Sequence, residues 1–328
     1  MSIRIALDAM GGDRAPGVTV QGAFLAAKEG VEVLLVGEEA RLRAELARLG
    51  TSLPIHHAPD WIPMEEHATE VRKRRESSIM VAMDLLKRGE VQAVVSMGHT
   101  GATMAAALFT LGRVKGVERP ALLVEFPSQR GRTFLLDGGA NADCRPFFLV
   151  QFAAMGLAYA EASGLKDPKV GLLSIGEEEG KGNALVLEAY PLLKAAFGGR
   201  FHGNVEGRDV FLGTAEVVVT DGFTGNVVLK LAEGEAKVLL GWVKEALTSS
   251  PLARLGALLA KGALRRVRDK VDPSQYGAMP LLGVEGAVFI GHGSADALAV
   301  KNALLRARNL VAAGLLDRVR AGLSALHV

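Results

Sequence analysis

The chain has 328 residues, of which 49% are hydrophobic and 5% aromatic, and its formal net charge is +2 at pH 7. This composition excludes a largely disordered chain, and the balanced charge with few aromatic side chains gives no sign of nucleic-acid binding. The single cysteine, Cys144, excludes an internal disulfide and a cysteine-rich zinc site. We expect a cytoplasmic α/β protein of one large domain over 1–328, possibly in two lobes, with no signal peptide or membrane-spanning segment.

Short apolar strands alternate with helical stretches along most of the chain. We expect strand 3–8, helix 17–29, strand 31–36, helix 38–49, strand 53–57, helix 77–88, strand 91–96 and helix 100–111. Paired strands at 121–126 and 133–137 precede helix 145–163, strand 169–175, helix 183–197, strand 215–220 and helix 225–247. Parallel strands joined by helices need helices on both faces of the sheet. The pattern therefore predicts a three-layer αβα sandwich with a mostly parallel sheet.

Six of these strands end in a loop rich in Gly, Asp, Asn, Ser or Thr. In the clearest case, Val217–Val227, a β-branched strand meets a glycine turn and then a helix. The other loops lie within 5–13, 94–102, 134–143, 171–183 and 288–294. One such loop is most simply a plain connection, but the unpaired N–H groups at a helix start also favour phosphate or an oxyanion. Since ligands bind at the carboxyl edge of a parallel sheet, six loops together predict an anion site.

Residues 249–272 break the βα pattern. Apolar side chains recur there at helical spacing, and between Leu252 and Val271 six basic residues stand against one acid, Asp269. The segment predicts a protruding, basic amphipathic helix that could lie on an anionic membrane surface. A surface helix or a dimer arm whose apolar stripe packs on protein is equally consistent with the pattern. The stripe consists of Leu252, Leu255, Leu259, Ala263, Val267 and Val271.

Taken together, these segments resemble the PlsX-type phosphate acyltransferases of bacterial phospholipid synthesis, from one end of the chain to the other. The resemblance is carried by 5–13, 15–16, 119–122, 136–141, 175–178, 181–182, 204–207, 220–226 and 281–283. It implies a homodimer, peripherally associated with the membrane, that converts acyl-[acyl-carrier-protein] and inorganic phosphate into acyl phosphate and free carrier protein. A membrane acyltransferase would then use the acyl phosphate to acylate glycerol 3-phosphate. The implied architecture is that of phosphotransacetylases and of isocitrate and isopropylmalate dehydrogenases.

One segment departs from the family pattern. The family usually has Ser-Ala-Gly-Asn-Thr-Gly where this chain has Ser96 to Gly101, so that His99 replaces an amide side chain. The glycines and Thr100 of this loop still fit an anion-binding turn.

The implied chemistry suits the residues. Attack of phosphate on a thioester needs an anion cradle, oxyanion donors and exclusion of water, but no metal, cofactor or covalent nucleophile. The chain accordingly has neither a Gly-x-Ser-x-Gly elbow nor a His-Glu-x-x-His helix. We predict Lys181 as the catalytic cation, although it could instead be a solvated lysine paired with neighbouring glutamates. We predict Asn226 as an oxyanion or phosphate donor, with helix capping as the alternative.

Further substrate contacts are predicted in the strand-end loops. Asp8 and Asp13 could orient phosphate or act as a base, but capping is the simpler role for at least one of them. An imidazole at His292 could handle a proton or be structural. Cys144, at a helix start, could have a lowered pKa, but a buried, inert thiol is the simpler reading. The predicted phosphate and substrate residues are Asp8, Gly11, Gly12, Asp13, Gly98, His99, Thr100, Gly101, Asn141, Asp221, Gly222, Thr224, Gly225 and His292.

The run 72–75 is the densest basic stretch outside 249–272. It could steer an acidic acyl carrier protein or bind phosphate, though a solvated helix face is the simpler interpretation.

Other functions also stay open. A phosphotransacetylase using acyl-coenzyme A or an NAD-dependent decarboxylating dehydrogenase would share the architecture, but the first βα turn lacks Gly-x-Gly-x-x-Gly. A non-catalytic acyl-carrier or membrane adaptor would need no converging polar loops.

Overall fold

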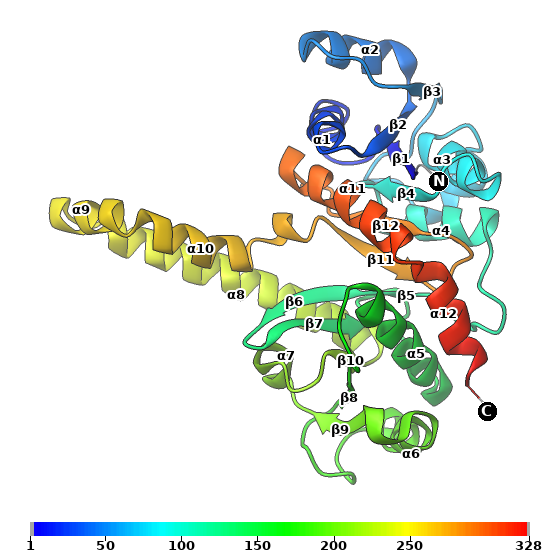
Figure 1. Ribbon diagram of the computed structural model, residues 1–328, viewed down its shortest axis with the longest axis vertical. Coiled ribbons are helices and arrows are strands. Elements are labelled where there is room, and N and C mark those ends of the chain that lie inside the picture. The colour runs from blue at the N-terminus through cyan, green and yellow to red at the C-terminus, as the bar shows by residue number, and fades with distance from the viewer. Residues whose placement is uncertain (1–2, 327–328) are drawn as a thin grey trace.

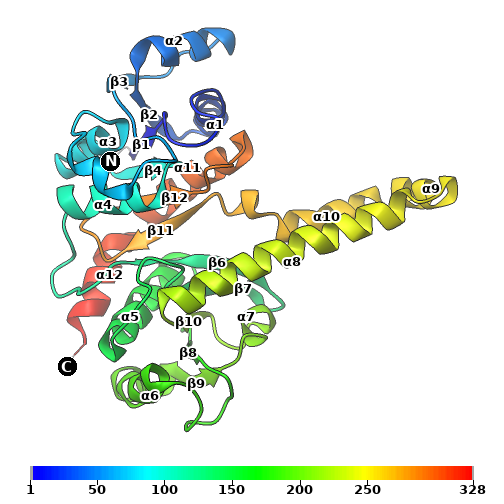
Figure 2. The same ribbon diagram turned by 180° about the vertical axis from the view of Figure 1, so that it is seen from behind.

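The computed structural model describes residues 3–326 and has two lobes with a long helical arm between them (Figures 1 and 2). The first lobe is built on a seven-stranded sheet. Its strands are β1 (Arg4–Asp8), β2 (Glu32–Gly37), β3 (Ile55–His57), β4 (Ala93–Ser96), β5 (Ala121–Leu122), β11 (Ala278–Leu282) and β12 (Val288–Gly291). The order is β3-β2-β1-β4-β12-β11-β5. The strands from β3 to β12 run parallel, whereas β11 is antiparallel to both neighbours.

Helices cover both faces of this sheet. They are α1 (Gly17–Lys28), α2 (Glu39–Arg48), α3 (Ser78–Lys87), α4 (Thr100–Thr110), α11 (Ala297–Ala312) and α12 (Leu315–Ser324), with 3₁₀ turns η1 (Ala68–Arg72) and η3 (Pro273–Gln275). Successive strand residues face opposite sides: Ile5 and Leu7 join one core cluster with α1 and α11, and Ala6 joins another with α3 and α4. The predicted three-layer αβα arrangement is thus confirmed.

The second lobe has a five-stranded sheet in the order β6-β7-β10-β8-β9. Its strands are β6 (Val124–Ser128), β7 (Gly131–Leu136), β8 (Val170–Leu173), β9 (Phe201–Val205) and β10 (Val217–Val219). All but β6 run parallel. Its other elements are α5 (Pro146–Ala162), α6 (Ala184–Phe197), the 3₁₀ turn η2 (Gly198–Arg200), α7 (Asp209–Leu212) and the start of α8 (Gly222–Thr248).

Helix α5 joins the two lobes. Every residue from Phe148 to Ala160 is buried, which is typical of a helix surrounded by protein. It packs against α6 of its own lobe and against α12, which returns from the first lobe (Figure 1). Its apolar residues belong to the same core cluster as Ile5 and Leu7 of β1, so one hydrophobic core continues from lobe to lobe.

The arm is formed by α8, α9 (Pro251–Leu259) and α10 (Lys261–Val271). In both views α8 runs out from the second lobe, and α9 and α10 lead back beside it to the first lobe. Gly222 and Gly225 are the buried residues of α8, and neither α9 nor α10 has a buried residue. No helix within residues 3–326 is long and apolar enough to cross a membrane.

Four details differ from the sequence predictions. The single helix expected over 249–272 is two helices that meet at Ala260, just before Gly262, a residue that weakens a helix interior. The strand expected over 121–126 divides at Leu123, where the chain passes from the first sheet to the second. The strand-end loops consequently lie on two sheet edges. The expected list also lacked β9, β11, α7, α11 and α12.

Gly225 shows how tightly α8 is seated on the second lobe. A Cβ atom at this position would lie 1.8 Å from the carbonyl oxygen of Asp137, whereas one at Gly234 would meet nothing within 4 Å. We predict that Gly225→Ala lowers the free energy of unfolding by about 3 kcal/mol, at the upper end of overpacking costs. Gly234→Ala, the matched control in the same helix, should raise it by about 1 kcal/mol through helix propensity. Urea denaturation measures both; equal effects would contradict the close approach.

Candidate active site

A buried carboxylate organises the edge of the first sheet. Asp8, at the end of β1, is 3% exposed. Its Oδ1 accepts a hydrogen bond from Ser78 Oγ at 2.6 Å, and its Oδ2 accepts one from Ser96 Oγ at 2.7 Å. Burial raises the pKa of Asp8, while these serines and the N–H groups of Met10 and Gly11 act in the opposite direction. Because both oxygens are engaged inside the protein, Asp8 holds loops together here.

The start of α4 provides free N–H donors at this edge. His99 caps the helix, with Nδ1 accepting from the N–H of Ala102 at 3.1 Å. Within residues 3–326, the N–H groups of Thr100 and Gly101 have no hydrogen-bond partner. Two free donors at the positive end of a helix dipole form an anion-binding end.

Close packing brings three loops to the same edge. A Cβ atom on Gly11 would lie 2.8 Å from the backbone nitrogen of Gly98, so the loops after β1 and β4 touch. The loop after β12 joins them, because the N–H of Asp13 donates to the carbonyl of Gly293 at 2.9 Å. Exposed His292 has its Nδ1 3.0 Å from Ser294 Oγ in this loop. Gly12 has a φ of +113°, which requires glycine at the turn.

A second buried carboxylate, Asp137, organises the edge of the other sheet. It follows β7 and is fully buried. Its Oδ1 accepts from the N–H groups of Leu122, Gly139 and Ala140 at 3.0 to 3.1 Å. Its Oδ2 accepts from the backbone N–H and Nδ2 of Asn141, at 2.7 and 2.9 Å. Burial raises the pKa of Asp137, and these donors oppose that shift.

The start of α8 is mostly occupied by the protein itself. Asp221 caps the helix, accepting from the N–H and hydroxyl of Thr224, both at 2.8 Å. The N–H of Gly222 donates to the carbonyl of Asn141 and that of Gly225 to the carbonyl of Asp221. Of the first helical N–H groups, that of Phe223 has no partner in the described chain. This helix end therefore offers fewer free donors than the sequence suggested.

Lys181 stands free in the loop after β8. Its neighbours Glu177 and Glu179 pair with Arg208 and Lys194, and no ion pair engages the Lys181 ammonium in the described chain. The backbone is fixed, because the carbonyl of Lys181 accepts from Ser174 Oγ at 3.0 Å. The alternative in which Lys181 pairs with the neighbouring glutamates is therefore not what the structure shows.

Asn226 is likewise exposed, and its side-chain amide makes no hydrogen bond within residues 3–326. It lies against the loop after β7: a Cβ atom on Gly139 would be 3.3 Å from Asn226 Cβ. Since β10 lies between β7 and β8 with all three parallel, Asn226 and Lys181 follow neighbouring strands at one sheet edge. Helix capping at this position falls to Asp221 instead.

The predicted site residues thus form two groups. The first group, in the loops after β1, β4 and β12 at the first edge, is Asp8, Gly11, Gly12, Asp13, Gly98, His99, Thr100, Gly101 and His292. The second group, in the loops after β7, β8 and β10 at the second edge, is Asn141, Lys181, Asp221, Gly222, Thr224, Gly225 and Asn226. The two edges are linked near β5, the strand after which the chain passes from the first sheet to the second. Asn141 Nδ2 donates to the carbonyl of Pro120 at 2.8 Å beside β5, and Ala140 packs against the first lobe's core.

Two structural residues at the second edge escaped the prediction, although both stand in quoted motifs. Asp137 was overlooked because its bonding to the following loop is visible only in three dimensions. Asn204, 3% exposed at the end of β9, donates through Nδ2 to the carbonyls of Glu178 at 2.8 Å and Lys181 at 3.3 Å. It therefore holds the Lys181 loop against the sheet.

Cys144 is not an activated thiol. Burial raises its pKa to about 12, chiefly by desolvating the thiolate. The alternative in which the helix start lowers this pKa is wrong, because Asp137, Asp221 and Asp143 add negative charge around the sulfur. At neutral pH the side chain is an uncharged thiol that lacks the thiolate needed for nucleophilic attack.

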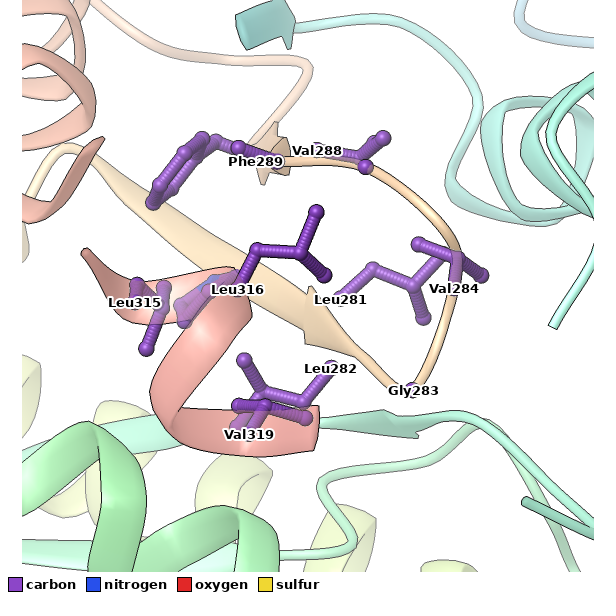
Figure 3. Close-up of a pocket in the computed structure, with 12 residues that line it drawn as sticks. Leu281, Leu282, Gly283, Val284, Val288, Phe289, Leu315, Leu316 and Val319 are labelled. Carbon is purple, nitrogen blue, oxygen red and sulfur yellow. The ribbon is translucent and has the colours of Figure 1, made fainter. Parts of the chain in front are cut away.

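An apolar pocket inside the first lobe can be set aside as a substrate site. In Figure 3, Leu281, Val288 and Phe289 from β11 and β12 surround the same small space as Leu316 and Val319 of α12. Its volume is about 20 Å³, close to that of a single water probe, and it has no polar side chain in its lining. It is a packing gap of the core.

The comparisons with known proteins come from sequence and from structure. A family model described as "fatty acid synthesis protein" matches residues 3–318. The chain belongs to this family. It is 81% identical over 326 residues to a phosphate acyltransferase of Thermus thermophilus, covering 99% of this chain and 100% of the relative. A phosphate acyltransferase of Pelotomaculum thermopropionicum is 50% identical over 331 residues, covering 99% and 96%. The resemblance to the PlsX-type phosphate acyltransferases is thereby confirmed.

Solved structures share the fold at low sequence identity. A phosphotransacetylase from Streptococcus pyogenes aligns with a TM-score of 0.64 and 17% identity, over 95% of this chain and 94% of that one. A 4-hydroxythreonine-4-phosphate dehydrogenase from Klebsiella pneumoniae aligns with a TM-score of 0.58 and 14% identity, over 94% and 99%. The predicted likeness to the phosphotransacetylase architecture is confirmed, and at these identities the likeness concerns the fold alone.

The raised pKa of Asp8 gives a pH-dependent stability. Since the pKa lies above the ordinary value of 3.8 in the folded chain, protonation stabilises the fold. This contribution is complete below pH 3.8 and is lost as the pH rises through the folded pKa. We predict that the free energy of unfolding of the unmodified protein, minus that of Asp8→Asn, falls as the pH rises above 3.8 and through the folded pKa of Asp8. Urea denaturation measures it; the Asp137 contribution is common to both proteins. A flat or rising difference would contradict the shift.

Proposed function

We propose that this protein transfers the acyl group of an acyl-[acyl-carrier-protein] to inorganic phosphate, giving acyl phosphate and free carrier protein. A phosphate oxygen attacks the thioester carbonyl carbon, a C–O bond forms, the C–S bond breaks, and the thiol leaves with a proton. The observation that carries the proposal is the pair of unengaged polar groups, Lys181 and Asn226, on neighbouring strand ends of a chain in the phosphate acyltransferase family.

Each residue has a definite role in this reaction. The Lys181 ammonium neutralises phosphate or the oxyanion that develops on the thioester oxygen, and the Asn226 amide donates a hydrogen bond to the same charge. The free N–H groups at the start of α4 offer a second anion contact. The thiol of the carrier leaves without strong acid assistance, because a free thiol has a pKa near 8.5. The proposed reaction requires no cofactor, metal or protein nucleophile.

The competing enzyme function is a phosphotransacetylase that uses acyl-coenzyme A. The shared fold favours it only at the level of architecture. The two differ in the donor: one carries its thioester on a protein, the other on a small nucleotide-containing molecule. Comparing acyl-[acyl-carrier-protein] with acyl-coenzyme A as donor therefore separates them.

The arm supports two further parts of the proposal. Val227, Leu231, Val238 and Trp242 recur along α8 at spacings of four and seven residues and are between 48% and 68% exposed. Such a stripe on an exposed helix is typical of a packing seam, so we assign it to a homodimer.

The tip, α9, carries exposed leucines that we assign to an anionic membrane surface, beside the membrane enzyme that would use the acyl phosphate. The protein would then be cytoplasmic and peripherally membrane-associated.

The catalytic assignments have a direct test. We expect Lys181→Ala and Asn226→Ala each to lower kcat/KM for phosphate-dependent release of free carrier by about 10²- to 10³-fold, the usual cost of one oxyanion contact. The matched control is Lys166→Ala, which removes another exposed lysine of the same lobe that forms no ion pair with the described residues. Near-normal turnover by a folded Lys181→Ala variant would refute its role.

The membrane assignment is tested at the tip of the arm. Leu255 and Leu259 are 53% and 82% exposed. We predict that Leu255→Glu with Leu259→Glu releases the protein from anionic phospholipid vesicles in a flotation assay, since buried apolar area drives interfacial binding. Leu187→Glu with Leu192→Glu, on exposed positions of α6, is the control and should float normally. Retained flotation of the arm variant would instead assign the leucines to a protein contact.

A further inference from the structure

A basic pocket lies at the far end of α4 from the candidate active site. Its volume is about 470 Å³. The apolar part of its lining comes from Met80 and Phe109, while Arg72, Arg75 and Lys87 supply three cations against one acid, Asp84. The name "basic pocket" is used below for this surface.

The cations of the basic pocket form no ion pair in the part of the chain that the structure describes. Within the run 72–75, Lys73 pairs with Glu70, and Arg74 pairs with Asp60 and Glu66. By contrast, Arg75 and Lys87 are exposed and form no ion pair within residues 3–326.

Arg72 is held in place by an aromatic ring. Its guanidinium carbon lies 3.9 Å from the centre of the Phe109 ring, a cation–π contact, and the Arg72 side chain is exposed. The basic run is thus divided: two side chains serve the fold, and two line the pocket together with Lys87.

Turn η1 connects the basic pocket to the anion-binding start of α4. Turn η1 packs along α4. At one end, Ala68 Cβ lies 2.9 Å from the Cβ position of Gly101, beside the free N–H groups; at the other end, Arg72 covers Phe109. The 11-residue helix α4 spans roughly 16 Å at about 1.5 Å per residue. A partner seated on the pocket is therefore one short helix from the anion-binding end.

We propose that the basic pocket is the docking surface for the acidic carrier protein that delivers the acyl thioester. The inference rests on the proposed function and adds the place where the donor binds. Charge complementarity supports it: the net charge of +2 provides little overall attraction, so an acidic partner must be recognised by a local, unneutralised patch. A lipid surface fits less well, because Arg72 covers the ring of Phe109, the exposed aromatic residue of the lining.

The experiment compares two double charge reversals with the same change in net charge. Arg75→Glu with Lys87→Glu alters the basic pocket, and Lys115→Glu with Lys166→Glu alters exposed lysines elsewhere that form no ion pair among the described residues. Both are checked for folding by thermal unfolding. Binding of a fluorescently labelled acyl carrier protein is measured by anisotropy at several salt concentrations. We expect about a tenfold or greater loss of affinity in the pocket variant and a flatter salt dependence, with little change in the control.

Turnover then separates docking from chemistry. With acyl-[acyl-carrier-protein] as donor, we expect the kcat/KM of the pocket variant to fall by about tenfold or more, mainly because KM for the donor rises. With acyl-pantetheine, which has no protein to dock, it should match the unmodified protein. Equal carrier binding by the two variants, or a defect that appears in the KM for phosphate instead, would overturn the docking assignment. Selective loss of binding in a protein that makes no acyl phosphate would keep the docking surface and reject the proposed reaction.

Discussion

The buried carboxylate of Asp137 is the interaction on which the arrangement of the second lobe depends. One of its five hydrogen-bond donors is the N–H of Leu122 in strand β5, and the other four come from residues 139–141, in the loop that follows Asp137. Burying a neutral polar group without a hydrogen bond costs about 2–7 kcal/mol, and burying a carboxylate costs more. Hydrogen-bond donors from the protein must therefore replace the lost water. Those donors fix the loop, whose Asn141 carbonyl in turn accepts the first N–H of α8. One charge thus connects both sheets to the base of the arm.

This use of internal charge determines what remains for a ligand. Asp137 takes the donors of its own loop, and Asp221 with Asn141 takes most of those at the start of α8. At the first edge Asp8 is satisfied by two serines, so the start of α4 keeps free N–H groups. The sequence makes all these polar loops look alike. The structure divides them into loops held by acids and positions, such as Lys181 and Asn226, whose side chains have no polar partner among residues 3–326.

The limits of the sequence follow from the range of the interactions. Alternating βα periodicity is local, so the layers and most elements could be predicted, including the strand and turn around Asp221. The division of 121–126 between two sheets depends on partners more than a hundred residues away, since β5 pairs with β11. The break at Ala260 and the burial of Cys144 likewise arise from surroundings that no local pattern contains. For the same reason, the sequence could indicate which residues are chemically suitable for the site, but not which of them are already hydrogen-bonded within the protein.

Exposure of the candidate catalytic groups places a demand on the substrate. An acyl phosphate is a mixed anhydride that water hydrolyses, yet Lys181 and Asn226 are both exposed in the single chain. Water must therefore be excluded by what binds. A small thioester covers little surface. A carrier protein docked at the far end of α4 would deliver its acyl thioester and would also cover the surface along η1. A protein-borne donor accordingly suits this open site better than a small one, because docking and water exclusion would then be the same event.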